Sequence, residues 1–146
     1  MKLVNSLGID DETPVVVYDD TFGALASRVA WTLEWIGHSD VTLLETTYGN
    51  WKSLGLETDS LTPEISNKEH SMNLQSNILA TSDYLESAKL RDDVILIDNR
   101  ERLKYLEQHI PGAVSLPYRT LASNDGILRP KAVSYTHLTL PTSDLV

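Results

Sequence analysis

Two short apolar runs with a periodic segment between them dominate the first third of the chain. Residues 15–18 (VVVY) form a β-branched and aromatic run without polar alternation, which is typical of a strand buried on both faces of a parallel sheet. Residues 22–36 then repeat apolar side chains at helical spacing, and Gly37 ends that segment. A second largely apolar run, 41–44, follows. The pattern predicts a β-α-β unit, in which the two strands are parallel.

The loop between this first strand and the helix occupies the place where open α/β sheets form their sites. Loops at the carboxyl ends of strands meet helix N-termini there, and these present unpaired N–H groups and a partial positive charge. Residues 19–23 (DDTFG) form this loop. We therefore expect the candidate chemistry of the first half at this position.

A polar segment divides the chain after the second strand. Residues 57–77 contain Pro63 and show no sustained period, which predicts a linker or a surface-hugging loop. Beyond it, the pattern predicts in order a short strand over 78–80, a helix over 83–90 capped by Thr81 or Ser82, a buried strand over 94–97, a charged helix over 101–107 and a strand ending at Leu116.

Composition and charge narrow the possible functions. The chain has 146 residues, 41% of them hydrophobic, which is enough for one ordinary core. The net charge of −9 argues against a nucleic-acid partner and against an anionic membrane surface. No apolar run approaches the roughly 18 residues of a membrane span, and no basic-then-apolar leader follows Met1, so a cytoplasmic location is expected. Composition does not indicate an oligomeric state.

The chain contains no cysteine. This excludes disulfides, thiolate metal sites and thiol nucleophiles within these residues. The histidines do not suggest a metal site either, because no second ligand stands at metal spacing from His38 or His109. We expect both to make hydrogen bonds within loops, and neither His70 nor His137 shows a pattern that indicates a role. Trp31 and Trp35, four residues apart, are expected to pack against another sheet face or domain.

Two blocks of residues resemble the rhodanese superfamily, and specifically its tandem-domain thiosulfate or 3-mercaptopyruvate sulfurtransferases. Residues 98–100 (DNR), Tyr105 and residues 109–113 (HIPGA) resemble the signature of the first half of a rhodanese domain, with Gln108 in place of its first glycine. The HIPGA turn is the most specific part of the match.

The other block, residues 15–51, resembles the second half of a rhodanese domain. The matching features are the strand and its loop, Ala-Ser-Arg at 26–28, Gly37-His38, Leu43-Leu44 and Trp51. Thr46 and Thr47 stand where the family usually has two glycines. The two blocks therefore occur in reversed order along the chain.

This order implies a division of the chain. Residues 1–57 would be the C-terminal half of a first, inactive rhodanese-like domain, 58–77 a linker and 78–130 the N-terminal half of a second domain. The tail, 131–146, resembles translated adapter read-through, which would make it non-native. The implied fold is α/β, a rhodanese-like parallel sheet flanked by helices.

The two halves could assemble in either of two ways. We expect them to join in permuted order into a single sheet, with strand 15–18 beside strand 94–97 and with Asp19 and Asp98 at the same edge. The alternative is two half-domains related as in a tandem parent, each with an open sheet edge.

The resemblance also implies roles for individual residues. In the family, the loop after the strand carries a cysteine that takes up sulfane sulfur as a persulfide, and Asp19 stands at that position here. A carboxylate cannot carry a persulfide, and the first domain of tandem sulfurtransferases commonly lacks the cysteine. This chain would therefore hold no catalytic residue, and the second domain's cysteine loop would lie beyond Arg129.

The remaining matched residues concern the second block. Arg100 corresponds to an arginine that helps to hold the anionic substrate, and its alternative role is a structural ion pair with Asp98 or Glu101. Asp98, His109 and Gly112 are expected to organise loops.

The implied activity of the intact parent is transfer of sulfane sulfur from thiosulfate or 3-mercaptopyruvate to a thiophilic acceptor such as cyanide or a thiol. Its partner would be a small anionic sulfur donor, with no cofactor or metal. One alternative is a non-catalytic rhodanese-like binding or regulatory module. A more remote one is a phosphoacceptor receiver-like domain, which also opens with a strand and paired acids like Asp19-Asp20 but leaves the HIPGA turn unexplained. A haloacid-type phosphatase needs Asp-x-Asp, a spacing that the chain lacks.

Overall fold

The computed structural model describes residues 2–89 and 91–121, so the tail expected over 131–146 lies outside the described residues. The first half contains α1 (Lys2–Ser6), β1 (Val15–Val17), α2 (Ala24–Trp35), β2 (Val41–Leu43) and α3 (Tyr48–Ser53). The second half contains the 3₁₀ turn η1 (Ser76–Ile78), α4 (Ser82–Ala88), β3 (Ile97–Asp98), α5 (Arg102–Glu107), β4 (Val114–Ser115) and the 3₁₀ turn η2 (Tyr118–Leu121).

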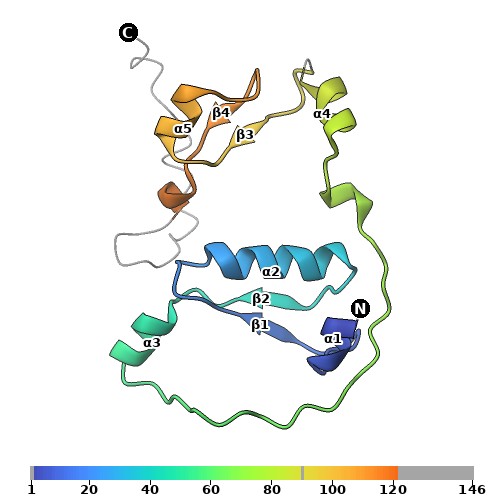
Figure 1. Ribbon diagram of the computed structural model, residues 1–146, viewed down its shortest axis with the longest axis vertical. Helices are drawn as coiled ribbons and strands as arrows, with labels where there is room; N and C mark the ends of the chain where they lie inside the picture. Colours follow the sequence, from blue (N-terminus) through green and yellow to red (C-terminus); the bar gives the residue numbers. More distant parts are fainter. Residues whose placement is uncertain (1, 90, 122–146) are drawn as a thin grey trace.

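The first half is the β-α-β unit that the apolar pattern predicts. β1 pairs in parallel with β2, with Val15 opposite Val41 and Val17 opposite Leu43. Helix α2 crosses over and covers one face of this two-stranded sheet (Figure 1), and it buries Ala26 and Leu33. The opposite face is open, because Val16 is 60% exposed. The prediction of a parallel unit is confirmed, whereas the expected burial of the first strand on both faces is wrong for the described residues.

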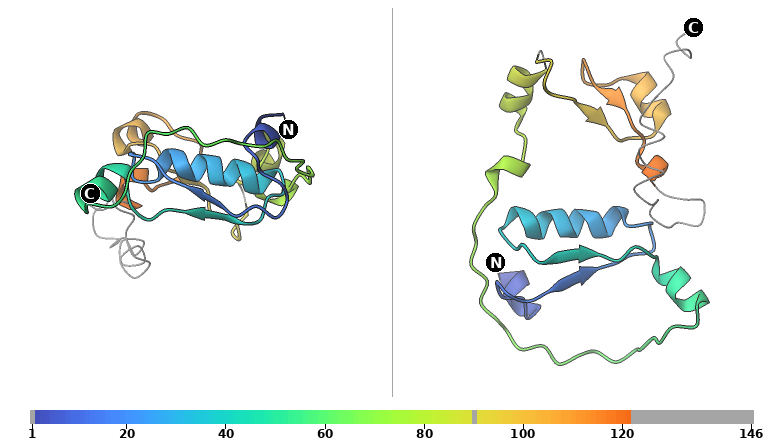
Figure 2. Two further views of the ribbon diagram at one scale, coloured as in Figure 1. Left: turned by 90° about the horizontal axis from the view of Figure 1, so that it is seen from below. Right: turned by 180° about the vertical axis from the view of Figure 1, so that it is seen from behind.

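The polar segment after α3 runs without regular structure along the outside of the first half (Figures 1 and 2). Backbone hydrogen bonds fasten its second part there. The N–H of Lys68 donates to the Asn5 carbonyl at 3.1 Å, and the N–H of Gln75 donates to the Trp35 carbonyl at 2.8 Å. The segment is therefore the surface-hugging loop that was one of the two forms predicted from its composition.

The second half is smaller and more open than the pattern predicts. Thr81 caps α4 as expected, because its Oγ1 accepts a hydrogen bond from the N–H of Tyr84 at 3.2 Å. The short strand predicted over 78–80 is wrong, since this region ends a 3₁₀ turn. The strand predicted over 94–97 is reduced to β3, which pairs in parallel with β4 alone. With one neighbouring strand and no covering layer, Ile95 stays 77% exposed.

The prediction of a single permuted sheet is wrong. Within the described residues, β1 pairs with β2 and β3 pairs with β4, in two separate two-stranded sheets. Each strand pairs with the strand that follows it in the chain, which closes a shorter loop than pairing across the polar segment would. That segment is tied along α1 and the end of α2, and α2 lies between the β1–β2 sheet and the second half (Figures 1 and 2). Among the described residues, no helix has both the length and the apolar character that a membrane crossing requires.

Candidate functional site

The loop that follows β1 is organised around the carboxylate of Asp19. Its Oδ1 accepts hydrogen bonds from the N–H groups of Thr21 at 2.7 Å and Gly23 at 2.9 Å. Its Oδ2 accepts from the N–H groups of Leu25 and Ala26, both at 2.8 Å, and from the Thr21 hydroxyl at 2.8 Å. The amides of Leu25 and Ala26 are among the donors that an α-helix leaves unpaired in its first turn, and those of Thr21 and Gly23 come from the loop that leads into it. The carboxylate of Asp19 thus occupies the anion site at the start of α2.

This environment keeps the Asp19 carboxylate charged. Partial burial of the group acts to raise the pKa of Asp19, but the hydrogen bonds from Ala26, Gly23 and Thr21 outweigh it and lower the pKa to about 2. The neighbouring Asp20 ties the same loop to α3, because its Oδ1 accepts from the N–H of Gly49 at 2.7 Å. The loop therefore surrounds the Asp19 carboxylate, and Asp20 attaches it to α3.

The same loop reaches the second half through an aromatic contact. Phe22 has a left-handed backbone conformation (φ +49°), which is uncommon for a residue other than glycine. Its ring stacks on that of Tyr118 in η2, with centroids 5.7 Å apart and an angle of 18° between the planes. A cavity of about 600 Å³ lies beside this contact, lined by Thr21, Phe22, Leu25, Asn99, Tyr118 and Arg119 among others. The loops that follow Asp19 and Asp98 therefore line one cavity, although their strands belong to separate sheets.

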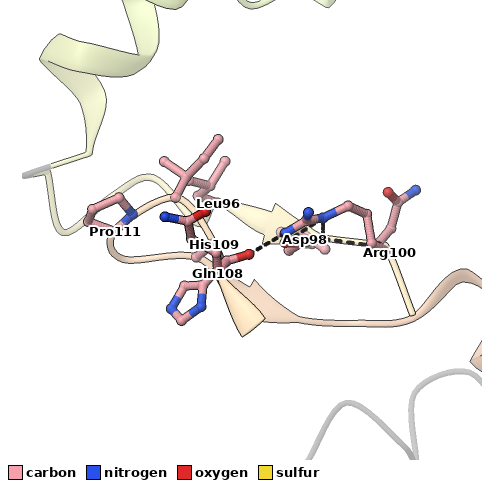
Figure 3. A pocket seen from close by; sticks show the side chains of 10 residues that line it. Leu96, Asp98, Arg100, Gln108, His109 and Pro111 are labelled. Carbon is pink, nitrogen blue, oxygen red and sulfur yellow. Dashed lines mark hydrogen bonds and ion pairs between the residues drawn. The ribbon is translucent and has the colours of Figure 1, made fainter. Parts of the chain in front are cut away.

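Arg100 forms a forked ion pair with Asp98 at the carboxyl end of β3 (Figure 3). Its Nε lies 3.0 Å from Oδ1 of Asp98 and its Nη2 lies 2.6 Å from Oδ2, while Nη2 also donates to the carbonyl of Gln108 at 2.7 Å. The hydrogen bonds from the Arg100 side chain and N–H lower the pKa of Asp98. Glu101, the other expected partner, pairs instead with Arg119 at 2.7 Å.

Arg100 and Asp98 line a second cavity of about 680 Å³ together with His109 and the turn that follows it. In this turn the N–H of Ala113 donates to the Ile110 carbonyl at 3.0 Å, and Gly112 has a positive φ of +85°. Proline followed by a residue with positive φ is the signature of a type II turn, which explains the glycine.

The histidine before this turn is fixed by Tyr105. Nδ1 of His109 lies 2.8 Å from the Tyr105 carbonyl, and the two rings stack with centroids 3.9 Å apart. The Tyr105 hydroxyl donates to the Ala113 carbonyl at 2.9 Å. The ring of His109 points away from Arg100 (Figure 3), so the two side chains do not form one binding group.

Two further expectations concern packing. His38 makes the predicted loop hydrogen bond, since its Nε2 lies 3.0 Å from the Thr13 carbonyl, but it also contacts His70, for which the sequence indicated no role. Trp31 and Trp35 stack on each other, with centroids 6.1 Å apart, and their expected packing on a sheet face or domain stays a prediction. Within residues 2–89 and 91–121, no three His, Cys, Asp or Glu side chains are arranged to hold a metal ion.

Comparisons with known proteins identify sequences similar to this chain. The family model for the rhodanese-like domain matches residues 81–144. Thiosulfate sulfurtransferase from Bos taurus is 32% identical over 144 residues, which cover 84% of this chain and 46% of that protein. 3-Mercaptopyruvate sulfurtransferase from Mus musculus is 30% identical over 136 residues, with the same coverage of both chains. Residues 81–144 thus match the rhodanese-like domain family, and the chain as a whole is similar to sulfurtransferases of that superfamily.

A solved structure shows the same rhodanese fold. SseA from Escherichia coli, described with the 3-mercaptopyruvate sulfotransferases, superimposes with a TM-score of 0.82 at 20% identity over 92% of this chain and 54% of its own. The α/β rhodanese-like fold and the family resemblance read from the sequence are thus confirmed. The chain spans about half the length of the curated relatives it matches.

Proposed function

We propose that this chain is part of a tandem-domain sulfurtransferase. Residues 1–57 are then the C-terminal half of its first domain, 58–77 the linker and 78–130 the N-terminal half of its second domain. The collinear match supports this division, because 84% of the chain aligns with less than half of each relative. The likeness to SseA supports it too, since one superposition covers 92% of the chain and so includes both halves in their mutual arrangement.

In this proposal, the intact protein moves sulfane sulfur in two steps. A cysteine thiolate attacks the outer sulfur of thiosulfate, the S–S bond breaks, and sulfite leaves with the electron pair. The resulting persulfide passes its outer sulfur to a thiophilic acceptor such as cyanide or a thiol, which regenerates the thiolate. With 3-mercaptopyruvate as donor, the enolate of pyruvate is the leaving group and takes up a proton. The names of the two relatives support these small anionic donors for this chain.

The chain as given would not perform this chemistry. It contains no cysteine, and the helix N-terminus that would receive an anionic sulfur group is filled by Asp19. This occupied anion site is the observation on which the proposal of an inactive first domain rests. An acid at a helix N-terminus is stabilised as an anion and has no polarizable sulfur to donate.

The proposed roles of the other site residues follow from their contacts. Asp98, His109 and Gly112 organise the loops around β3 and β4, which is supported by the ion pair, the stacking on Tyr105 and the positive φ described above. Arg100 binds the anionic donor in the intact protein. Its guanidinium is half exposed beside the second cavity, so it can approach an anion while it remains paired with Asp98.

A non-catalytic rhodanese-like binding or regulatory module is the second candidate. The absence of a thiol from all 146 residues favours it. The match of residues 81–144 to the rhodanese-like domain family argues against the receiver-like alternative. A cytoplasmic location stays a prediction.

The decisive experiment measures thiocyanate formation from thiosulfate and cyanide by the purified chain, with a tandem sulfurtransferase of known activity as positive control. We expect background turnover, and measurable thiocyanate would contradict the inactive assignment. Reading the coding region downstream of these residues separates the two candidates. A cysteine-containing loop encoded within about 60 residues would support the tandem enzyme, and a natural stop codon would support the binding module.

A further inference from the structure

Two buried histidines join the polar segment to the first half. His38 follows α2 and is 1% exposed, and His70 lies in the segment after α3 and is 7% exposed. Nδ1 of His38 lies 3.2 Å from Nε2 of His70, and the ring centroids are 5.2 Å apart. Neither histidine belongs to the candidate site.

The hydrogen-bond partners determine where the protons of the uncharged pair must lie. Nε2 of His38 is 3.0 Å from the Thr13 carbonyl, which can only accept, so this nitrogen carries a proton. In the neutral ring, Nδ1 of His38 therefore has a lone pair. The contact between the rings is then a hydrogen bond only if Nε2 of His70 is the donor. The neutral pair thus has a single consistent arrangement, in which Nδ1 of His70 bears no proton.

Among the described residues, that last nitrogen has no hydrogen-bond partner. Nδ1 of His70 is buried, and Oδ1 of Asp11 lies 3.7 Å from it. Hydrogen bonds from Ser71 lower the pKa of Asp11, which keeps its carboxylate charged. In the neutral pair, a lone pair thus faces an anion, which is unfavourable.

We propose that the His38–His70 pair is a proton-operated clasp, in which uptake of one proton adds an ion pair between His70 and Asp11 to the hydrogen bonds that run from Thr13 through both rings. The added proton places an N–H at Nδ1 of His70 and breaks none of the existing contacts. The charge so formed is hydrogen-bonded and lies beside a carboxylate, as a buried charge requires. Protonation of the pair therefore fastens residues 68–73 to the first half.

The other groups around the pair do not oppose this charge. On the turn before β1, Asp10 is paired with Lys68 of the segment at 2.9 Å. Helix α1 contributes the neutral Asn5, whose Oδ1 accepts from the N–H of His70 at 3.3 Å. Glu69, the neighbour of His70 in the chain, is exposed. Of the two neighbouring acids, Asp10 is paired with Lys68, and the carboxylate that faces the histidine pair is that of Asp11.

The test uses the whole chain and follows the ring nitrogens of both histidines by NMR between pH 8 and pH 5. At pH 8 we expect the Nε2–H tautomer in both rings, and on acidification the uptake of one proton by the pair with the contact between the rings retained. Hydrogen exchange at the amides of Lys68, His70, Ser71 and Asn73, relative to those of α2, should slow by about two- to fivefold. An Nδ1–H tautomer at neutral His38, or protection that stays constant or falls, would overturn the clasp.

Matched variants distinguish the effect of the His70–Asp11 charge pair from the effect of the neighbouring acid in the turn before β1. Asp11→Asn keeps an oxygen for the Ser71 amide but removes the charge, so the gain in protection on acidification should disappear. Asp10→Asn changes the neighbouring acid, which pairs with Lys68, and should keep the gain. His70→Gln can still donate to His38 but takes up no proton, so it should keep the protection measured at pH 8 and lose the gain. If both aspartate variants lose the gain alike, or if His70→Gln retains it, the proposal fails.

Discussion

The ring of Phe22 stacks on the ring of Tyr118, and this contact joins the loop after β1 to the last described turn of the second half. The two residues lie 96 positions apart in the chain, on either side of the polar segment. Phe22 makes the contact from a left-handed backbone conformation, which costs free energy and is kept only where the surroundings fix it. The loop over residues 19–23 contains no thiol, but through Phe22 it packs against the second half.

The first prediction concerns the energy of this contact. A double-mutant cycle with Phe22→Ala, Tyr118→Ala and the double variant should give a coupling of about 0.5–1.5 kcal/mol in the free energy of unfolding. Phe22→Ala alone should cost less than a typical aromatic truncation, because both rings are only half-buried. Urea unfolding of the four proteins provides the measurement, and strictly additive effects would show that the rings are not coupled.

The second prediction concerns the stability of the fold in acid. The pKa of Asp19 is lowered from 3.8 to about 2 in the folded chain, so its contribution to stability is fully present above about pH 4 and is lost as the pH falls towards 2. Asp19→Asn should reduce the free energy of unfolding at pH 6 by about 1–2 kcal/mol and should flatten its decrease over this window.

Urea unfolding at a series of pH values checks this expectation. Glu34→Gln is the matched control, since Glu34 is an exposed acid on the same helix. Equal acid sensitivity of the wild type and Asp19→Asn would show that Asp19 does not hold a depressed pKa.

The third prediction concerns restoring a thiol to the loop. Asp19→Cys should leave thiocyanate formation at background, because the loop amides and the Thr21 hydroxyl are arranged around two carboxylate oxygens. A single sulfur at this position cannot accept hydrogen bonds from all five of these groups, so the loop is not arranged to activate a thiolate. Thiol titration of the folded variant checks whether the new cysteine reacts with a small reagent, and sustained turnover would show that the scaffold retains a working site.

The fourth prediction separates the two roles of Arg100 in the full-length parent. If Arg100 binds the donor, Arg100→Ala should raise KM for thiosulfate by about tenfold or more while the melting temperature changes little. Arg100→Lys keeps the positive charge but not the forked geometry of the guanidinium, so its KM should lie between those of the wild type and Arg100→Ala. A large fall in melting temperature with an unchanged KM would assign Arg100 to the structural ion pair with Asp98 alone.

The fifth prediction concerns the turn at Gly112. A Cβ added there would meet the Lys89 carbonyl at 3.7 Å, an ordinary contact, so the cost of Gly112→Ala comes from the φ of +85°. We expect about 1–2 kcal/mol of destabilisation by denaturant unfolding. Gly112→Asn is the matched variant, since asparagine tolerates this conformation better, and it should cost less. Equal losses for both would point to a steric cause.

Local signals predicted the local structure well. The β-branched run at 15–18 and the apolar repeat in α2 specify a β-α-β unit on their own, because strand, helix and crossover lie within about 30 residues. The acid at position 19 and the helix after it likewise placed an anion at a helix N-terminus before any contact was known. Such features depend on neighbours in sequence.

The parts that the sequence did not reveal depend on distant partners. Strands apolar on both faces indicated a fully buried sheet, but burial requires neighbours that are not among the described residues, and Val16 and Ile95 stay exposed. The role of His70 depends on His38, 32 positions away, and on a segment without periodicity. No local pattern distinguishes such a histidine from one on the surface.

The open faces of the two small sheets have a practical consequence for anyone who handles this polypeptide in isolation. In the part of the chain that the structure describes, no further strand pairs with either two-stranded sheet, and an edge strand with exposed β-branched side chains is a template for the strand of another molecule. At high protein concentration, self-association should therefore compete with the monomer, and dilute samples would be the appropriate starting point for every measurement described above.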